Sequence, residues 1–335
     1  MNSAYLRFAL TRLGQAVVVV LLAYVLTFVV ISVLPGDPLT STLRNPENGF
    51  SEDQIQQMVE FYGLDRPVWL QLVEALSRFV RGDLGVSLRS SQPVAVIVGD
   101  ALPSTFALAA SALGVALVLA FAIAYGTQVL PRRAAQVLRS VPALFLSVPN
   151  FVIGLLLLNV FAFQLGLFSV IDPDAPAATL FAAVALGIPV SAQIAQVLIT
   201  GLDHEFAEDY AVVAYARGLG RPRLFFAHLL KPSALPVVTI VALTVGELLG
   251  GALITETVFG RAGIGSVVQT AVATQDLPVL QAVVALAAVI FVAVNLAADL
   301  LYPLLDPRVP LLQPRHAGPR TAAAEPSLLE NASVR

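Results

Sequence analysis

Six long apolar runs restrict how this chain can fold more than any other feature. Five of them contain no charged residue, and they cover residues 13–34, 101–130, 140–171, 175–202 and 277–298. The sixth, residues 232–255, is interrupted only by Glu247. About 20 apolar residues in a helix suffice to cross the hydrocarbon core of a bilayer, where backbone N–H and C=O groups find no water and must bond within the helix. The sequence therefore predicts an all-α polytopic membrane protein with six transmembrane helices.

Composition agrees with this class and excludes several others. Hydrophobic residues make up 57% of the chain and charged residues 12%, about half the charged share of a typical soluble domain. The net charge of −3 does not favour nucleic-acid binding. Because there is no cysteine, disulfides, thiolate catalysis and cysteine-ligated metals are excluded.

The first apolar run has two interpretations. Arg7 and Arg12 precede it, as basic residues precede the apolar part of a signal peptide. However, residues 13–34 are longer than such a segment needs, and no small-residue cleavage site follows. We expect residues 1–12 to be a cytoplasmic N-terminus and residues 13–34 to be a retained first span.

The basic residues near the ends of the runs predict the orientation. If six helices alternate, one side receives Arg7, Arg12, Arg132, Arg133, Arg139, Arg217, Arg221, Arg223, Lys231 and Arg308. Loops rich in Lys and Arg stay in the cytoplasm, so both termini are expected there. Residues 35–100 then form an extracytoplasmic segment, in which the apolar spacing predicts two short amphipathic helices. The Pro-, Ala- and Ser-rich residues 310–335 are expected to be a disordered tail.

Residues that carry common chemistries are not arranged for them. Lys231 has no glycine-rich loop before it, so a Walker-type ATP site is not predicted. His204, His228 and His316 do not have the spacing of a metal site. The central spans hold no paired catalytic groups, which argues against an intramembrane enzyme.

A polar segment, residues 203–235, separates two apolar runs. Residues 209–216 read as a helix, Gly218 and Gly220 interrupt it, and Pro222 begins a second helix. The second helix is basic on one side and carries Leu224, Phe225, Phe226, Leu229 and Leu230 on the other. A bent, amphipathic pair of helices suits docking into a groove of a soluble partner.

This segment resembles the coupling loop, often called the EAA loop, of binding-protein-dependent ABC importer permeases. Five further stretches are similar to the B-type membrane subunit of dipeptide and oligopeptide importers: "VLPGDP" at 33–38, "YGLDRPVWLQ" at 62–71, "RGDLGVSLRSSQPV" at 81–94, "ETVFGRAGIG" at 256–265 and "NLAADLLYPLLDPR" at 295–308. The resemblance covers roughly residues 5–309. It implies the type I importer permease fold, with residues 101–309 as the permease core and residues 203–235 as the coupling loop.

The resemblance also implies a division of labour. A paralogous permease would complete the pore for a peptide substrate, an extracytoplasmic binding protein would deliver that substrate, and two ABC ATPase subunits would bind ATP and Mg²⁺, so this chain would need no cofactor. It would lie among lipids in the cell membrane of a bacterium. The residues that the resemblance assigns to ATPase coupling are Ala214, Ala216, Arg217, Gly218, Leu219, Arg221, Leu224 and Phe225.

The chain departs from the family pattern at two places. The acid that names the EAA loop is absent at the start of "AYARG". In "ETVFGRAGIG", Ala262 stands where the family commonly has proline, and Arg261 adds a charge. Nickel and glutathione importers have similar permeases; the absence of histidine and cysteine from the spans and outer loops disfavours nickel.

Glu247 and Asn295 are the candidate residues of a translocation path. A carboxylate inside a span needs water or a partner, so Glu247 could bind the amine of a passing peptide or hydrogen-bond to a neighbouring helix. The second interpretation is the more common one. An ion-coupled secondary transporter remains an alternative from another class, but it would need buried acids or repeated halves, and the sequence shows one such acid and no evident repeat.

Overall fold

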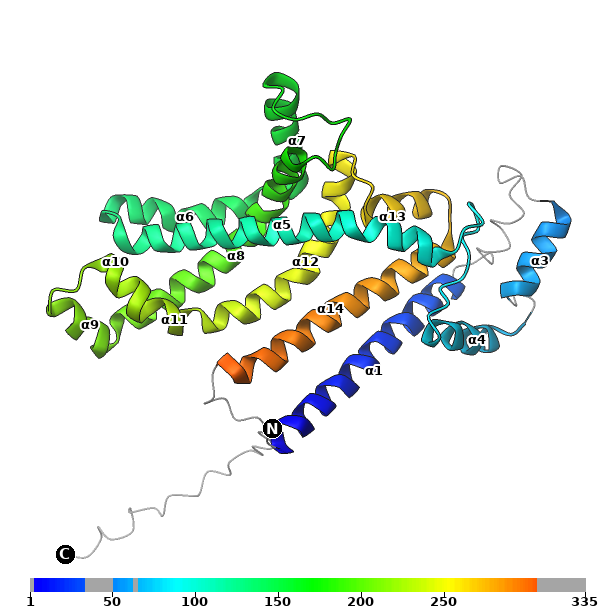
Figure 1. Ribbon diagram of the computed structural model, residues 1–335, viewed down its shortest axis with the longest axis horizontal. Coiled ribbons are helices and arrows are strands. Elements are labelled where there is room, and N and C mark those ends of the chain that lie inside the picture. Colours follow the sequence, from blue (N-terminus) through cyan, green and yellow to red (C-terminus); the bar gives the residue numbers. More distant parts are fainter. Residues whose placement is uncertain (1–2, 34–50, 63–65, 306–335) are drawn as a thin grey trace, which may run out of the picture.

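The computed structural model describes residues 3–33, 51–62 and 66–305, and these are almost entirely helical (Figure 1). The helices are α1 (Ser3–Val33), α3 (Glu52–Tyr62), α4 (Val68–Val80), α5 (Val94–Val129), α6 (Arg132–Ser147), α7 (Asn150–Leu157), the π-helix η2 (Leu158–Gln164), α8 (Pro176–Ala207), α9 (Asp209–Ala216), α10 (Arg221–Leu224), the π-helix η3 (Phe225–Leu229), α11 (Leu230–Ser233), α12 (Leu235–Phe259), α13 (Ile264–Ala273) and α14 (Leu277–Leu305). Within the described residues, the β-structure is limited to one isolated bridge between Val86 and Pro93. The all-α polytopic prediction is confirmed.

Five helices are long and apolar enough to cross a membrane, namely α1, α5, α8, α12 and α14. A sixth span exists if α6 and the helix that follows it count together, although they meet at an angle of 96°. The prediction of one continuous span over residues 140–171 is therefore wrong in detail. The apolar run is divided between the end of α6 and the pair α7 and η2. The earlier part of α6 carries three arginines.

Local backbone chemistry explains the break. Proline disfavours a helical conformation for the residue before it, and Val148, which precedes Pro149, is extended with φ −108° and ψ 122°. Pro149 itself is extended and stands just before α7, which begins at Asn150. Two successive non-helical residues redirect the chain far more than a simple proline kink. Figure 1 shows α6 lying along α5 and α7 leaving that layer.

The packing of α5 against α8 forms the centre of the molecule. Small residues face each other there, including the fully buried Ala112 and Ala116 of α5 and Ala182 of α8. Gly187 of α8 lies so close that an added Cβ would be 2.7 Å from the carbonyl oxygen of Ala112. This close approach makes α5 and α8 a tightly packed pair on which the other helices are placed.

The segment between the first two spans contains α3 and α4, where the apolar spacing predicts helices. Ser51 caps α3: its backbone N–H donates to Gln54 Oε1 over 2.9 Å, and its hydroxyl accepts from the Gln54 N–H over 3.3 Å. Helix α4 packs on α1, where the rings of Tyr24 and Phe79 stack at 4.4 Å between centroids. The "VLPGDP" stretch beyond Val33 and the tail expected over residues 310–335 lie outside the described residues.

Candidate functional site

The segment α9–α11 (residues 209–233) is built around a glycine turn. Helix α9 ends where Gly218 takes φ +88°, a left-handed conformation that non-glycine residues rarely adopt. The Leu219 N–H then donates to the Ala214 carbonyl over 3.2 Å and the Gly218 N–H to the Tyr215 carbonyl over 3.0 Å, which is the hydrogen-bond pattern of a Schellman motif. Gly220 is extended and precedes α10. The predicted helix, glycine break and second helix are all present.

Except for Phe226, which is 56% exposed, the apolar side of the second helix faces inward, which corrects most of the predicted docking surface. Leu224, Phe225 and Leu229 are fully buried, and the Phe225 ring packs edge-on against Tyr125 and Phe121 of α5 at centroid distances of 5.1 and 5.6 Å. These side chains fasten the segment to the span helices. The interpretation of Leu224 and Phe225 as surface contacts of a partner is therefore wrong, since no surface of either is available.

The other exposed large apolar residues of this segment lie on α9. They are Tyr210, Val212, Val213 and Tyr215, each between 44% and 54% exposed. Ala216, Arg217, Gly218 and Arg221 lie beside them on the surface, whereas Ala214 and Leu219 are half-buried against the core. Sequence reasoning missed the α9 face, although "YAVVAY" is apolar on every side and a helix of this kind cannot bury all of its sides against the core.

Polar contacts connect the α9–α11 segment to three span helices. Arg221 donates to the Gln128 carbonyl of α5 over 3.3 Å, and the Gln128 amide donates to Asp203 of α8 over 3.1 Å. Arg139 of α6 forms a two-pronged ion pair with the same carboxylate, at 2.8 Å for one contact. Movement of Arg221 can thus reach α5, α6 and α8 through consecutive bonds.

Tyr210 fixes the start of α9. Its hydroxyl donates to a carboxylate oxygen of Glu205, and burial together with this hydrogen bond raises the pKa of Tyr210 to about 12. The hydroxyl therefore remains protonated at neutral pH and the bond to Glu205 persists. This contact holds α9 against the end of α8.

The two candidate path residues lie on different helices. Glu247, near the middle of α12, is exposed in this chain and accepts a hydrogen bond of 2.7 Å from the Gln193 side-chain amide of α8. Asn295 of α14 is half-buried and donates to the Phe291 carbonyl of its own helix over 2.8 Å. No hydrogen bond joins Glu247 to Asn295 in the part of the chain that the structure describes. The hydrogen bond to a neighbouring helix, one of the two interpretations of Glu247, is present.

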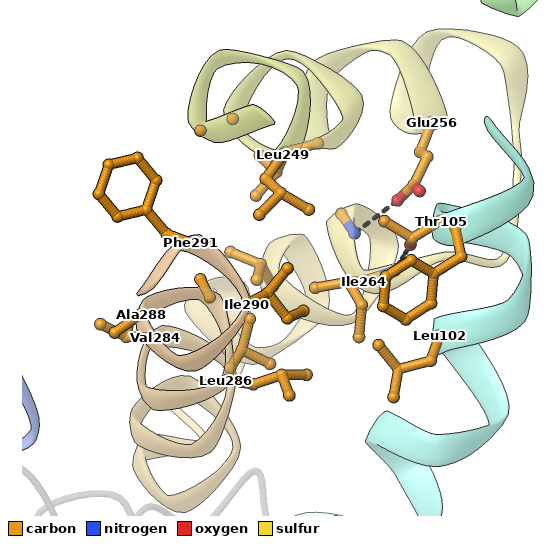
Figure 2. Close-up of a pocket in the computed structure, with 18 residues that line it drawn as sticks. Leu102, Thr105, Leu249, Glu256, Ile264, Val284, Leu286, Ala288, Ile290 and Phe291 are labelled. Carbon is orange, nitrogen blue, oxygen red and sulfur yellow. Dashed lines mark hydrogen bonds between the residues drawn. The ribbon is translucent and has the colours of Figure 1, made fainter. Parts of the chain in front are cut away.

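The end of α12 carries a buried carboxylate, Glu256 (Figure 2). Its Oε2 accepts from the Gly265 N–H over 2.6 Å at the start of α13, while Thr105 of α5 accepts from the Ile264 N–H over 2.8 Å. A Cβ on Gly263 or Gly265 would lie 2.3 or 2.8 Å from this carboxylate, so both glycines leave room for it. Glu256 thereby closes the turn between α12 and α13.

Arg261, in the same turn, is 2% exposed. It donates to the Pro173 carbonyl over 2.6 Å and to the Thr179 hydroxyl over 2.7 Å, and it pairs with Asp174 at 2.8 Å. The charge by which the "ETVFGRAGIG" stretch departs from its family pattern thus joins the α12–α13 turn to the start of α8. Across residues 3–33, 51–62 and 66–305, no cluster of three or more metal-binding side chains occurs.

Comparison with known proteins identifies the family. Residues 116–310 match the family described as "Binding-protein-dependent transport system inner membrane component", and residues 5–109 match its N-terminal companion. The chain belongs to this family. It is a permease subunit of an ABC importer and an inner-membrane protein, and family membership leaves the secondary-transporter alternative without support.

Individual relatives align with this permease over nearly their full lengths. A probable peptide ABC transporter permease protein, y4tP, of Sinorhizobium fredii is 30% identical, with 90% of this chain and 98% of that protein covered. The glutathione transport system permease protein GsiC of Escherichia coli K12 is also 30% identical, with 91% and 99% covered. A solved structure titled "Crystal structure of an amino acid ABC transporter with histidines" aligns with a TM-score of 0.49 and 16% identity, over 62% of this chain and 94% of that one.

Proposed function

We propose that this permease imports peptides, and that it forms the pore together with a paralogous permease. The observation that carries this proposal is the full-length similarity to a protein named as a probable peptide ABC transporter permease. Glutathione, which is itself a small peptide, is a second candidate substrate because GsiC is equally similar. An extracytoplasmic binding protein delivers the substrate in both cases.

The energy comes from two separate ABC ATPase subunits, which hold ATP and Mg²⁺. Support for this lies in the α9–α11 segment, whose exposed apolar residues on α9 offer a contact surface while its buried residues fix it to the spans. Ala216, Arg217 and Arg221 border that surface. Leu224 and Phe225 act one step later, because they pass movement of the segment into α5.

The cytoplasmic location of both termini is part of the same proposal. In Figure 1, the N-terminal end of α1, the C-terminal end of α14 and the α9–α11 segment all lie toward the left and lower side of the view. An ATPase bound to α9 must be cytoplasmic, and the termini would share its side. Glu247 and Asn295 belong to the translocation path in this proposal.

Co-purification and uptake test the proposed function directly. A tagged form of this chain should recover a second permease and an ABC ATPase from mild detergent, and the reconstituted complex with its binding protein should take up labelled di- or tripeptides in an ATP-dependent manner. Uptake of glutathione but of no other peptide would select the second candidate. Absence of an ATPase from the purified complex would contradict the proposal.

Neutralising Glu247 should change which peptides are carried. For Glu247→Gln we expect KM for peptides with cationic side chains to rise roughly three- to tenfold, the size of a single partly screened charge interaction of about 1 kcal/mol, while KM for neutral peptides changes little. Asp53→Asn on α3, which removes a carboxylate far from the spans, is the control. Unchanged uptake of both peptide classes would restrict Glu247 to its structural bond with Gln193.

A further inference from the structure

The exposed strip of α8 is polar in the middle of an otherwise buried helix. Between Phe181 and Leu202, a stretch that the structure describes in full, only Gln196 and Thr200 are exposed, and Gln193 beside them is half-buried. The spacing of three and four residues places Gln193, Gln196 and Thr200 on one face, which His204 continues. We call Gln193, Gln196, Thr200 and His204 the α8 strip.

Contact with lipid does not suit this strip. An amide or carboxylate without a partner costs several kcal/mol in hydrocarbon, so such groups face water, a cavity or another polar group. Lipid-compatible surface elsewhere in the same bundle is apolar, as at Leu117 and Val118 of α5, which are 39% and 68% exposed. The α8 strip must therefore lie against something other than acyl chains.

Neighbouring residues turn the strip into one wall of a passage. At the N-terminal end of the strip, the Gln193 side-chain amide donates a hydrogen bond of 2.7 Å to the Glu247 carboxylate of α12. Toward the C-terminal end of the strip, Gln196, Thr200 and His204 line an open pocket of about 440 Å³ that reaches Pro236, at the start of α12. The eleven residue-to-residue steps from Gln193 to His204 correspond to about 16 Å of helix, roughly half the thickness of the hydrocarbon core.

The side chains on this wall retain hydrogen-bonding capacity. The Thr200 hydroxyl donates to the Gln196 backbone carbonyl over 2.8 Å, which leaves its acceptor lone pairs directed outward. The Gln196 side-chain amide makes no hydrogen bond to any described residue. An amide can donate to a peptide carbonyl and accept from a peptide N–H, so it can bind groups that recur in every peptide whatever its sequence.

We propose that the α8 strip lines the cytoplasmic half of the substrate path, where Gln196 and Thr200 hydrogen-bond to the backbone of a passing peptide. Gln193 is a positioning residue that aims the Glu247 carboxylate into this path. The inference rests on the proposed peptide import and extends it from Glu247 to Gln193, Gln196 and Thr200, which the sequence did not single out. Because the bonds are to backbone groups, the strip transmits peptides without selecting their side chains.

The absence of cysteine from the chain provides a direct test. Single variants Gln196→Cys, Thr200→Cys and, as the matched apolar control, Val118→Cys are incorporated into the full complex in membrane vesicles. Each is treated with a charged, water-soluble thiosulfonate, and modification of this chain is followed by mass spectrometry. Because only a thiolate in contact with water reacts, we expect Gln196→Cys and Thr200→Cys to react at least about tenfold faster than Val118→Cys.

Addition of binding protein, peptide and a non-hydrolysable ATP analogue should then slow modification of Gln196→Cys severalfold. Rates as low as that of Val118→Cys would mean that the strip is covered by the second permease, and they would overturn the inference, as would rapid modification that no peptide slows. Peptide uptake by the cysteine-free complex is measured in parallel. If the cysteine-free complex takes up peptide but Gln196→Cys is unreactive, then the role of the α8 strip is refuted and the proposed peptide import is not. If Gln196→Cys is reactive but the cysteine-free complex takes up no peptide, then the proposed substrate is refuted.

Discussion

Gly218→Val should abolish the stimulation of ATP hydrolysis by peptide while the complex still assembles. An added Cβ at this position would meet nothing within 4 Å, so steric crowding by neighbours is not the cause. The cause is the backbone, because φ +88° is strained for any L-residue by about 1–2 kcal/mol and more for a β-branched one. The chain relieves this strain by leaving the left-handed conformation, which breaks the bond from the Leu219 N–H to the Ala214 carbonyl.

The loss of that turn changes the angle between α9 and α10. Most of the exposed apolar residues lie on α9, whereas Arg221 at the start of α10 contacts α5 and the buried Phe225 comes directly after α10. The surface and the attachment would therefore no longer move as one body. In proteoliposomes with binding protein and peptide, we expect the stimulated part of ATP hydrolysis to fall at least about tenfold, equivalent to about 1.4 kcal/mol or more of coupling free energy. Basal hydrolysis and recovery of the partner subunits should remain near wild type.

Gly220→Val is the matched control in the same turn. Gly220 has φ −67° and ψ 148°, a conformation that valine adopts readily, and open space surrounds it. Gly218→Asn should retain part of the stimulation, since asparagine tolerates the left-handed region. Normal stimulation in Gly218→Val would show that the conformation of this turn is not required for coupling.

The membrane spans were predictable because their cause is local. An apolar run of 20 or more residues has one stable backbone conformation in lipid, whatever its neighbours, and α1, α5, α8, α12 and α14 follow from this alone. The glycine turn at Gly218 was predictable for the same reason, since three consecutive residues, Gly218 to Gly220, are enough to indicate the end of a helix. The 96° break at Pro149 was underestimated because a proline inside an apolar run usually bends a helix without ending it.

The burial of the second helix of the α9–α11 segment could not be read from the sequence. Its spacing shows which side of the helix is apolar, but the surface that covers that side comes from Phe121 and Tyr125, about 100 residues earlier. An external partner and an internal neighbour produce the same pattern. The Gln193–Glu247 bond was hidden similarly, because the two side chains meet only after α8 and α12 pack together.

Arg261 illustrates how a departure from a family pattern becomes part of the structure. It lies beside the buried Glu256 carboxylate, on which its positive charge acts, and it satisfies the Pro173 carbonyl and the Thr179 hydroxyl. Buried polar groups of this kind need their partners, since each one left without a hydrogen bond costs about 1–3 kcal/mol. The link between the α12–α13 turn and the start of α8 consequently depends on the Arg261 side chain.

Arg261→Met should therefore destabilise this permease strongly. The ion-pair partner of Arg261, Asp174, is 54% exposed, so the expected loss comes mainly from the Pro173 carbonyl and the Thr179 hydroxyl, each of which costs about 1–3 kcal/mol when left without its hydrogen bond. We expect a clear fall in the midpoint of thermal unfolding in detergent, together with faster proteolysis near residues 260–263. Arg66→Met, which breaks the exposed pair with Glu74 on α4, is the control and should change the free energy of unfolding by less than about 1 kcal/mol.

The double variant Arg261→Met/Glu256→Gln separates an electrostatic cause from a packing cause. If the loss in Arg261→Met comes from the uncompensated Glu256 carboxylate, then neutralising that carboxylate removes the buried charge, and the double variant should unfold at a higher temperature than Arg261→Met alone. The side-chain amide introduced by Glu256→Gln can still accept from the Gly265 N–H through its oxygen, so the turn itself is retained. The losses in Arg261→Met and Glu256→Gln could instead add up to the loss in the double variant. That result would assign the whole effect of Arg261→Met to its lost contacts with Pro173, Asp174 and Thr179.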